Sequence, residues 1–212
     1  MISMQKRNSK FKRIILTGST IGNISYLDNY IWNLQHVPNI EENLEYLEIT
    51  NIARNNESTI NGYILKPRFG GFVLGSAKKN SIKHLNLERN WIGDIDESFL
   101  RIFTSLRTLK LARNSIKRVA NNAFINMPHL ERLNLRRNAI IKLEKRLFDT
   151  IKNLIYFDVS NNELEELDDG SFSLLKKLEY IDLTRNNIKV LTALTFDGLV
   201  SLKVKSILLI LI

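Results

Sequence analysis

Apolar residues in the second half of the chain recur with a fixed period of 24 residues. One apolar column opens each unit, and two more follow three and five residues later with a polar residue between them. An asparagine then ends the pattern, at Asn90, Asn114, Asn138, Asn162 and Asn186. A period of this length, kept through five units, is typical of a solenoid in which one short structural unit is stacked repeatedly.

Each unit predicts a short, half-buried strand. In Leu133-Asn134-Leu135 apolar and polar residues alternate, so that successive side chains point to opposite faces. A single strand of this kind cannot bury its apolar face. Stacked copies can, because they pair edge to edge into a parallel sheet and share one long core.

The repeated asparagines and large apolar residues are predicted to be structural. An inward-pointing amide has two donors and an acceptor, which can satisfy backbone groups buried at the turn after each strand. A further column of large side chains comes late in each unit and is predicted to fill the wider side of the coil; it consists of Leu100, Phe124, Phe148, Phe172 and Phe196.

Four regions follow from the pattern. We predict a disordered basic N-terminus over 1–10, irregular N-terminal repeats with insertions over 11–81, five regular units over 82–201, and an aberrant hydrophobic tail over 202–212, where the column pattern fails. In the irregular region, Ile14, Leu16, Leu44, Leu47 and Ile49 fit the strand columns, and the insertions run over 26–42 and 53–81. The structure of 53–81 stays open at this point.

The composition speaks against catalysis. The chain has no cysteine, which excludes disulfides and thiol chemistry, and its three histidines lack metal-ligand spacing. Nothing resembles a nucleophile motif, so we expect no enzyme activity, no catalytic residue, no metal and no cofactor. The net charge of +9 raises the possibility of anionic partners, but the charge is spread along the chain without a known nucleic-acid motif.

The repeat reads Leu-x-x-Leu-x-Leu-x-x-Asn-x-Ile-x-x-Ile, with a Phe six residues before the next unit. Over 82–202 this resembles the leucine-rich repeat family, in the 24-residue form typical of extracellular animal proteins such as Toll-type receptors, Slit and chaoptin-like adhesion proteins. The resemblance implies an α/β solenoid. A curved parallel β-sheet would form the concave face, and short helical turns and loops would form the convex side.

The resemblance also implies a compartment. It favours a cell-surface or secreted receptor or adhesion protein. Extracellular members usually carry disulfide-bonded caps at their ends, and this chain has no cysteine, so it would be a fragment of such a protein. The lack of cysteine and of a signal peptide favours the alternative, an intracellular leucine-rich-repeat scaffold or regulatory subunit in the cytoplasm. Membrane contact would come only through missing flanking segments.

Outward strand positions on the concave face are the candidate binding residues. Two predicted patches emerge there, a basic centre and an aromatic-acidic patch, formed by Lys110, Arg132 and Arg136 (flanked by Arg113 and Arg137) and by Tyr156, Asp158, Tyr180 and Asp182. Tyr and Arg often anchor protein interfaces, so a protein ligand is the expected partner, without a small-molecule substrate. Two alternatives remain: cross-strand contacts that only stabilise the sheet, and an anionic ligand, either a glycan or a nucleic acid, of which nucleic acid is the less expected.

Overall fold

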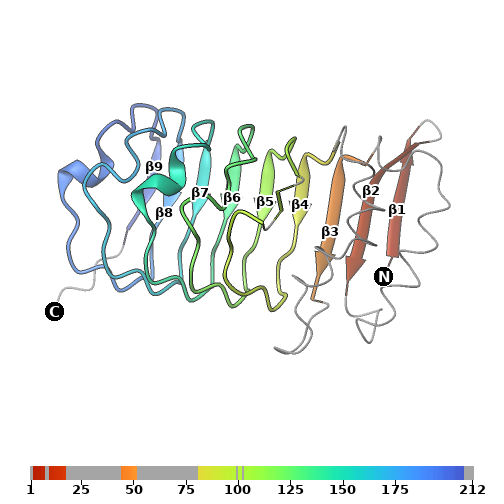
Figure 1. Cartoon of the computed structure of the whole chain (residues 1–212), viewed down its shortest axis with the longest axis horizontal. Helices are drawn as coiled ribbons and strands as arrows, with labels where there is room; N and C mark the ends of the chain where they lie inside the picture. Colours follow the sequence, from red (N-terminus) through yellow and green to blue (C-terminus); the bar gives the residue numbers. More distant parts are fainter. Residues whose placement is uncertain are drawn as a thin grey trace.

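The computed structural model describes residues 2–7, 10–17, 44–51, 81–98, 100–101 and 103–207. In these parts nine strands form one sheet, and their order in space is their order in the chain. They are β1 (Ile2–Arg7), β2 (Lys10–Thr17), β3 (Tyr46–Thr50), β4 (His84–Asn86), β5 (Thr108–Lys110), β6 (Arg132–Asn134), β7 (Tyr156–Asp158), β8 (Tyr180–Asp182) and β9 (Val204–Ser206). Figure 1 shows the strands side by side, with β1 and β9 at opposite ends of the sheet.

Strands β2 to β9 are parallel, as the repeat predicts. From β4 onward each strand residue pairs with the residue 24 positions later, so that Tyr156 lies beside Tyr180 and Leu109 beside Leu133. The return loops carry two short 3-10 helices, η1 (Lys145–Phe148) and η2 (Ala193–Phe196), on the other side of the core from the sheet (Figure 1). The predicted solenoid with a parallel sheet and short helical turns is therefore confirmed.

The core is continuous from one coil to the next. The inward residues Leu109, Leu133 and Phe157 are fully buried. The rings of Phe148 and Phe172 are 5.4 Å apart, and the ring of Phe148 meets that of Phe157 at 5.5 Å. Since these contacts cross from coil to coil, each unit completes the core of its neighbours.

The repeated asparagines connect consecutive coils. The Nδ2 of Asn162 donates to the carbonyl oxygens of Val159 in its own coil (2.9 Å) and Leu135 in the preceding coil (3.0 Å). Its Oδ1 accepts a hydrogen bond from the backbone N–H of Ile140 at 3.0 Å. The same two donations recur at Asn114, Asn138 and Asn186. One side chain thus satisfies three backbone groups drawn from two coils.

The N-terminus departs from the predicted disorder. Residues 2–7 form β1, which pairs antiparallel with β2, with Ile2 opposite Leu16 and Arg7 opposite Lys10. The local sequence carries the signal, because apolar Ile2 and Met4 alternate with polar residues in the period of a strand. Pairing with β1 also covers the edge of β2, which would otherwise present unpaired backbone groups.

The C-terminal segment also differs from the prediction. Although the apolar pattern fails after Leu202, Val204–Ser206 form β9 and continue the parallel sheet beside β8. Lys205 occupies the inward column opposite Ile181, and its Nζ lies 4.3 Å from the ring centroid of Phe196. Lys205 is exposed, so its ammonium stays hydrated while the ring attracts the charge. The last residues, 208–212, and the predicted insertions, apart from Ser81, lie outside the described residues.

The asparagine contacts predict a stability cost. Replacing Asn162 by alanine leaves the N–H of Ile140 without its partner and removes one of the two amide donors from the carbonyls of Leu135 and Val159, which should lower the free energy of unfolding by about 2 kcal/mol. Urea denaturation followed by circular dichroism measures the change. Asn187→Ala, at an exposed neighbouring position, is the matched control and should shift stability by less than about 0.5 kcal/mol. Equal losses in the two variants would contradict the structural role of the buried amide.

Candidate functional site

Strand register brings the predicted tyrosines into direct contact on the concave face, the side of the sheet turned away from the core. The rings of Tyr156 and Tyr180 are stacked, with centroids 4.6 Å apart and an interplanar angle of 6°. The Arg132 guanidinium carbon, from the strand on the other side, lies 4.3 Å from the Tyr156 centroid. The Tyr156 ring therefore lies between a cation and a second ring. We call Arg132, Tyr156 and Tyr180 the Arg–Tyr strip.

The two predicted aspartates form hydrogen bonds within the fold, at the strand ends. The Oδ1 of Asp158 accepts hydrogen bonds from the backbone N–H and the hydroxyl of Ser160, at 2.9 and 2.7 Å. Asp182 does the same for Thr184, at the same two distances. Each carboxylate thereby fixes the chain as it leaves the strand. Asp158 is only 3% exposed, so its part in the site is to position neighbours rather than to touch a partner.

The aspartates also orient the tyrosines. The hydroxyls of Tyr156 and Tyr180 point to the Oδ2 atoms of Asp158 and Asp182, each at 3.4 Å. Burial, followed by the negative charge of Asp158, raises the pKa of Tyr156 to about 12. Burial and Asp182 raise the pKa of Tyr180 as well. Both phenols therefore remain protonated donors at neutral pH.

The predicted basic centre is divided between two neighbourhoods. Arg132 belongs to the strip. Arg136 is exposed beside the flanking arginines, and its backbone carbonyl accepts the N–H of Arg113 at 2.9 Å. Lys110 is exposed at the last position of β5, and the neighbouring strands place Asn86 and Asn134 on either side of it. The seven predicted residues share one face, with the basic and aromatic sets joined through Arg132.

A second Arg–Tyr contact lies nearer the N-terminus and was missed by the sequence analysis. The guanidinium carbon of Arg13 is 4.1 Å from the ring centroid of Tyr46, and the Tyr46 hydroxyl donates to Glu48 at 2.6 Å. His84 continues the column, with its ring 6.3 Å from that of Tyr46 and its Nδ1 3.0 Å from the Thr108 hydroxyl. The sequence carries a signal for this contact, because Tyr46 precedes an inward Leu as Tyr156 precedes Phe157, but the insertions interrupt the 24-residue period there.

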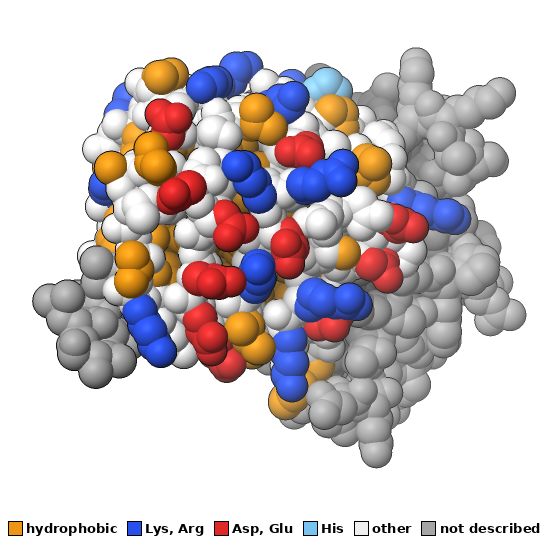
Figure 2. All heavy atoms as spheres, turned by 60° about the vertical axis from the view of Figure 1, so that its left-hand side comes forward, with side chains coloured by type: hydrophobic (Ala, Val, Ile, Leu, Met, Phe, Trp, Pro, Cys, Tyr) orange, Lys and Arg blue, Asp and Glu red, His pale blue; other side chains and the backbone are white. Residues whose placement is uncertain are grey.

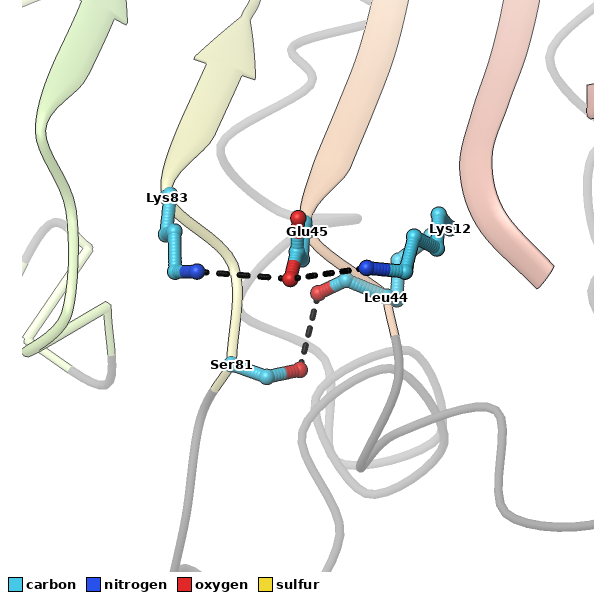
Figure 3. A network of polar contacts seen from close by, with 5 residues as sticks. All are labelled: Lys12, Leu44, Glu45, Ser81 and Lys83. Carbon is cyan, nitrogen blue, oxygen red and sulfur yellow. Dashed lines mark hydrogen bonds and ion pairs between the residues drawn. The ribbon is translucent and has the colours of Figure 1, made fainter. Parts of the chain in front are cut away.

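One border of the concave face is lined by ion pairs. Glu45 accepts from Lys12 at 3.4 Å and from Lys83 at 3.3 Å, and Ser81 donates to the carbonyl of Leu44 below them (Figure 3). Further along, the same position holds the pairs Arg107–Glu131 and Lys203–Glu179. We call this border, formed by Lys12 within β2 and by the residue just before each later strand, the paired rim. Each of its ion pairs joins opposite charges on neighbouring strands, so the rim contributes to sheet stability.

Comparison with known proteins identifies the repeats. The family model described as leucine rich repeat matches residues 80–140, 104–164, 128–188 and 152–204. The chain belongs to the leucine-rich repeat family. No curated protein matches the chain in sequence.

A solved structure has a similar fold. The crystal structure described as a TLR13–ssRNA13 complex superposes on 82% of this chain with a TM-score of 0.62 and 26% sequence identity. The chain spans 23% of the length of that leucine-rich repeat protein. In the described part of our chain, no helix has the length and apolar character needed to cross a bilayer. The same residues contain no cluster of metal-ligating side chains.

The raised pKa of Tyr156 predicts alkaline destabilisation. In the unfolded chain the phenol ionises near pH 10, whereas in the fold it holds its proton to about pH 12. Unfolding therefore releases a proton in this window, and the free energy of unfolding should fall as pH rises from about 10 to 12. Denaturation at several pH values measures the slope, which Tyr156→Phe should reduce. Asp158→Asn, which removes the charge, should lower the Tyr156 pKa in a spectrophotometric titration. A slope unchanged in Tyr156→Phe would contradict the assignment.

Proposed function

We propose that this chain is a non-enzymatic recognition module that binds a protein partner through the Arg–Tyr strip on its concave face. The observation that carries the proposal is the stack of Arg132, Tyr156 and Tyr180. Tyr and Arg dominate interface hot spots because they bury a large area with few rotatable bonds and still offer hydrogen-bond donors. In the strip these side chains are already held in place before a partner arrives.

Preorganisation supports binding energetically. Ordering a long side chain at an interface costs about 0.5–1.5 kcal/mol, and a partner of the strip avoids much of that cost. The stacking fixes the rings, and Asp158 and Asp182 fix the hydroxyls. Arg132 is exposed and the two tyrosines are half-buried, so the ring edges, the hydroxyls and the guanidinium remain within reach of a ligand. Lys110 and Arg136, both exposed, would extend the contact toward acidic groups of the same partner.

The likeness to a TLR13 structure supports a cell-surface or secreted setting, as part of a larger receptor or adhesion protein. The alternative is an intracellular scaffold or regulatory subunit, and the absence of cysteine supports it. That similar structure is described as a complex with ssRNA. It supports nucleic acid as a partner, which is the less expected anionic ligand on sequence grounds. A single-stranded nucleic acid is thus the second candidate ligand, favoured by the exposed basic side chains of Lys110, Arg132 and Arg136.

Loss of the strip should weaken partner binding. We expect Tyr156→Ala/Tyr180→Ala to weaken binding to a partner by tenfold or more, since each hot-spot truncation costs upward of about 1 kcal/mol. Proteins captured from an extracellular fraction by the wild-type chain, and lost with the double variant, identify candidates whose dissociation constants are then measured with purified material. Ile125→Ala/Ile141→Ala removes two exposed apolar side chains outside the strands and is the matched control.

The control should retain binding. Circular dichroism confirms that both variants fold, and Tyr156→Phe/Tyr180→Phe separates the contribution of the rings from that of the hydroxyls. Equal partner recovery by the wild type and Tyr156→Ala/Tyr180→Ala would rule out the strip as the site. Selective capture of RNA, lost in the double variant, would favour the second candidate.

A further inference from the structure

We propose that a second site lies along the opposite border of the concave face, where Arg89, Arg113, Arg136 and Arg137 form an arginine ridge that binds a linear sulfated polysaccharide. The ridge follows the ends of β4, β5 and β6. The Arg–Tyr strip occupies the first position of the strands, and Arg136 is the one ridge residue that the protein contact proposed above also uses. Arg89, Arg113 and Arg137 lie outside that contact, so the proposal goes beyond protein recognition and can fail independently of it.

The backbone ladder fixes the spacing of the ridge. The N–H of Arg89 donates to the carbonyl of Ala112 at 3.0 Å, and that of Arg113 donates to Arg136 at 2.9 Å. Arg137 continues the series by donating to Ser160 at 2.9 Å. Parallel strands lie about 4.8 Å apart, so Arg89, Arg113 and Arg137 stand one per coil at that interval. Arg185 occupies the same position two coils further on, after Asn161.

The charges of the ridge repel one another. Arg137 and then Arg89 lower the pKa of Arg113, and Arg136 adds to the effect. Glu88, in the neighbouring column, opposes it. None of the ion pairs in the described part of the chain includes a ridge arginine.

Two other parts of the surface arrange their charged side chains differently. In the paired rim each ion pair joins opposite charges on neighbouring coils. On the face seen in Figure 2, acidic side chains are interspersed with lysine and arginine. The ridge instead carries a row of exposed like charges, and an external polyanion would relieve its repulsion.

The backbone at the ridge is also conformationally costly. Arg89, Arg113 and Arg137 have φ values of 58°, 58° and 56°, in the left-handed region. This conformation costs a residue with a side chain roughly 1–2 kcal/mol, and less for asparagine. The chain places Asn51 and Asn161 at equivalent positions, so asparagine fits the turn. Arginine there gains no ion pair in the fold, which points to a use outside it.

Sulfate suits this surface better than nucleic acid does. A guanidinium presents a planar fork of donors that matches sulfate or phosphate oxygens in pairs. Nucleic-acid strands usually add stacking of successive bases on aromatic rings. Here both faces of Tyr156 are already covered, by Arg132 and Tyr180. The ridge itself has no aromatic residue; the nearest in sequence is Trp91, 39% exposed, at one end. Charge recognition without base stacking favours a sulfated glycan.

Binding of the whole chain to heparin, a highly sulfated probe, tests the proposal. Isothermal titration over a range of salt concentrations should show affinity that falls steeply with ionic strength. Arg113→Asn/Arg137→Asn should weaken binding about tenfold, because each exposed charge contact contributes up to roughly 1 kcal/mol. Asparagine is chosen because the chain already uses it at this turn. Arg101→Asn/Arg118→Asn removes the same charge from exposed positions off the ridge and should change affinity less than twofold.

Any one of three results would overturn the proposal. Equal losses in the two double variants would mean that only the net charge of the chain attracts heparin. Undiminished binding to desulfated heparin would exclude sulfate recognition. Tighter binding to a single-stranded RNA homopolymer than to heparin at the same salt would assign the ridge to nucleic acid. Tyr156→Ala/Tyr180→Ala should leave heparin affinity unchanged, so failure of the ridge and failure of the strip are distinguishable.

Discussion

The fold depends on an amide shared between coils. Because Asn162 bonds to carbonyls of two consecutive coils and accepts an N–H from the earlier one, the earlier coil does not satisfy its buried backbone alone. The apolar columns have the same property, since the ring of each Phe completes a neighbouring layer. The unit of stability is consequently the interface between coils rather than the coil. This constraint fixes the register so that, through the regular units, residues 24 positions apart are neighbours.

Fixed register turns the sequence into a set of columns, and each column then behaves according to its own composition. Before the strands, the column of Glu131 and Glu179 meets basic neighbours and is neutralised. At the first strand position, Arg132, Tyr156 and Tyr180 stack. After the strands, Arg113 and Arg137 meet and repel. Three surfaces with different chemistry thus arise on one small face without any change in the backbone.

Periodicity explains which features could be predicted from sequence. The buried columns, the parallel order and the proximity of Tyr156 to Tyr180 follow from counting in steps of 24. The role of Asp158 does not, because its bonds to Ser160 depend on the local course of the chain at the strand end. The partnership of Arg13 with Tyr46 was missed for a different reason: insertions break the period there. β1 and β9 were missed because neither matches the repeat, although β1 follows the simpler period of a strand and backbone pairing alone extends the sheet to β9.

The residue just before each ladder asparagine is the position where function has most freedom to act on this fold. Core columns are restricted by volume, and the ladder asparagines by hydrogen bonding. At Arg113 the restriction is only on φ, and the side chain is exposed. A substitution there that accepts the positive φ and keeps the backbone N–H changes the surface while the register and the core stay as they are. Since asparagine meets the conformational demand at lower cost and occurs at Asn161, the stability of the coil does not account for arginine at Arg89, Arg113 and Arg137. The repulsion among these arginines adds to that cost, so the fold alone explains neither their identity nor their alignment.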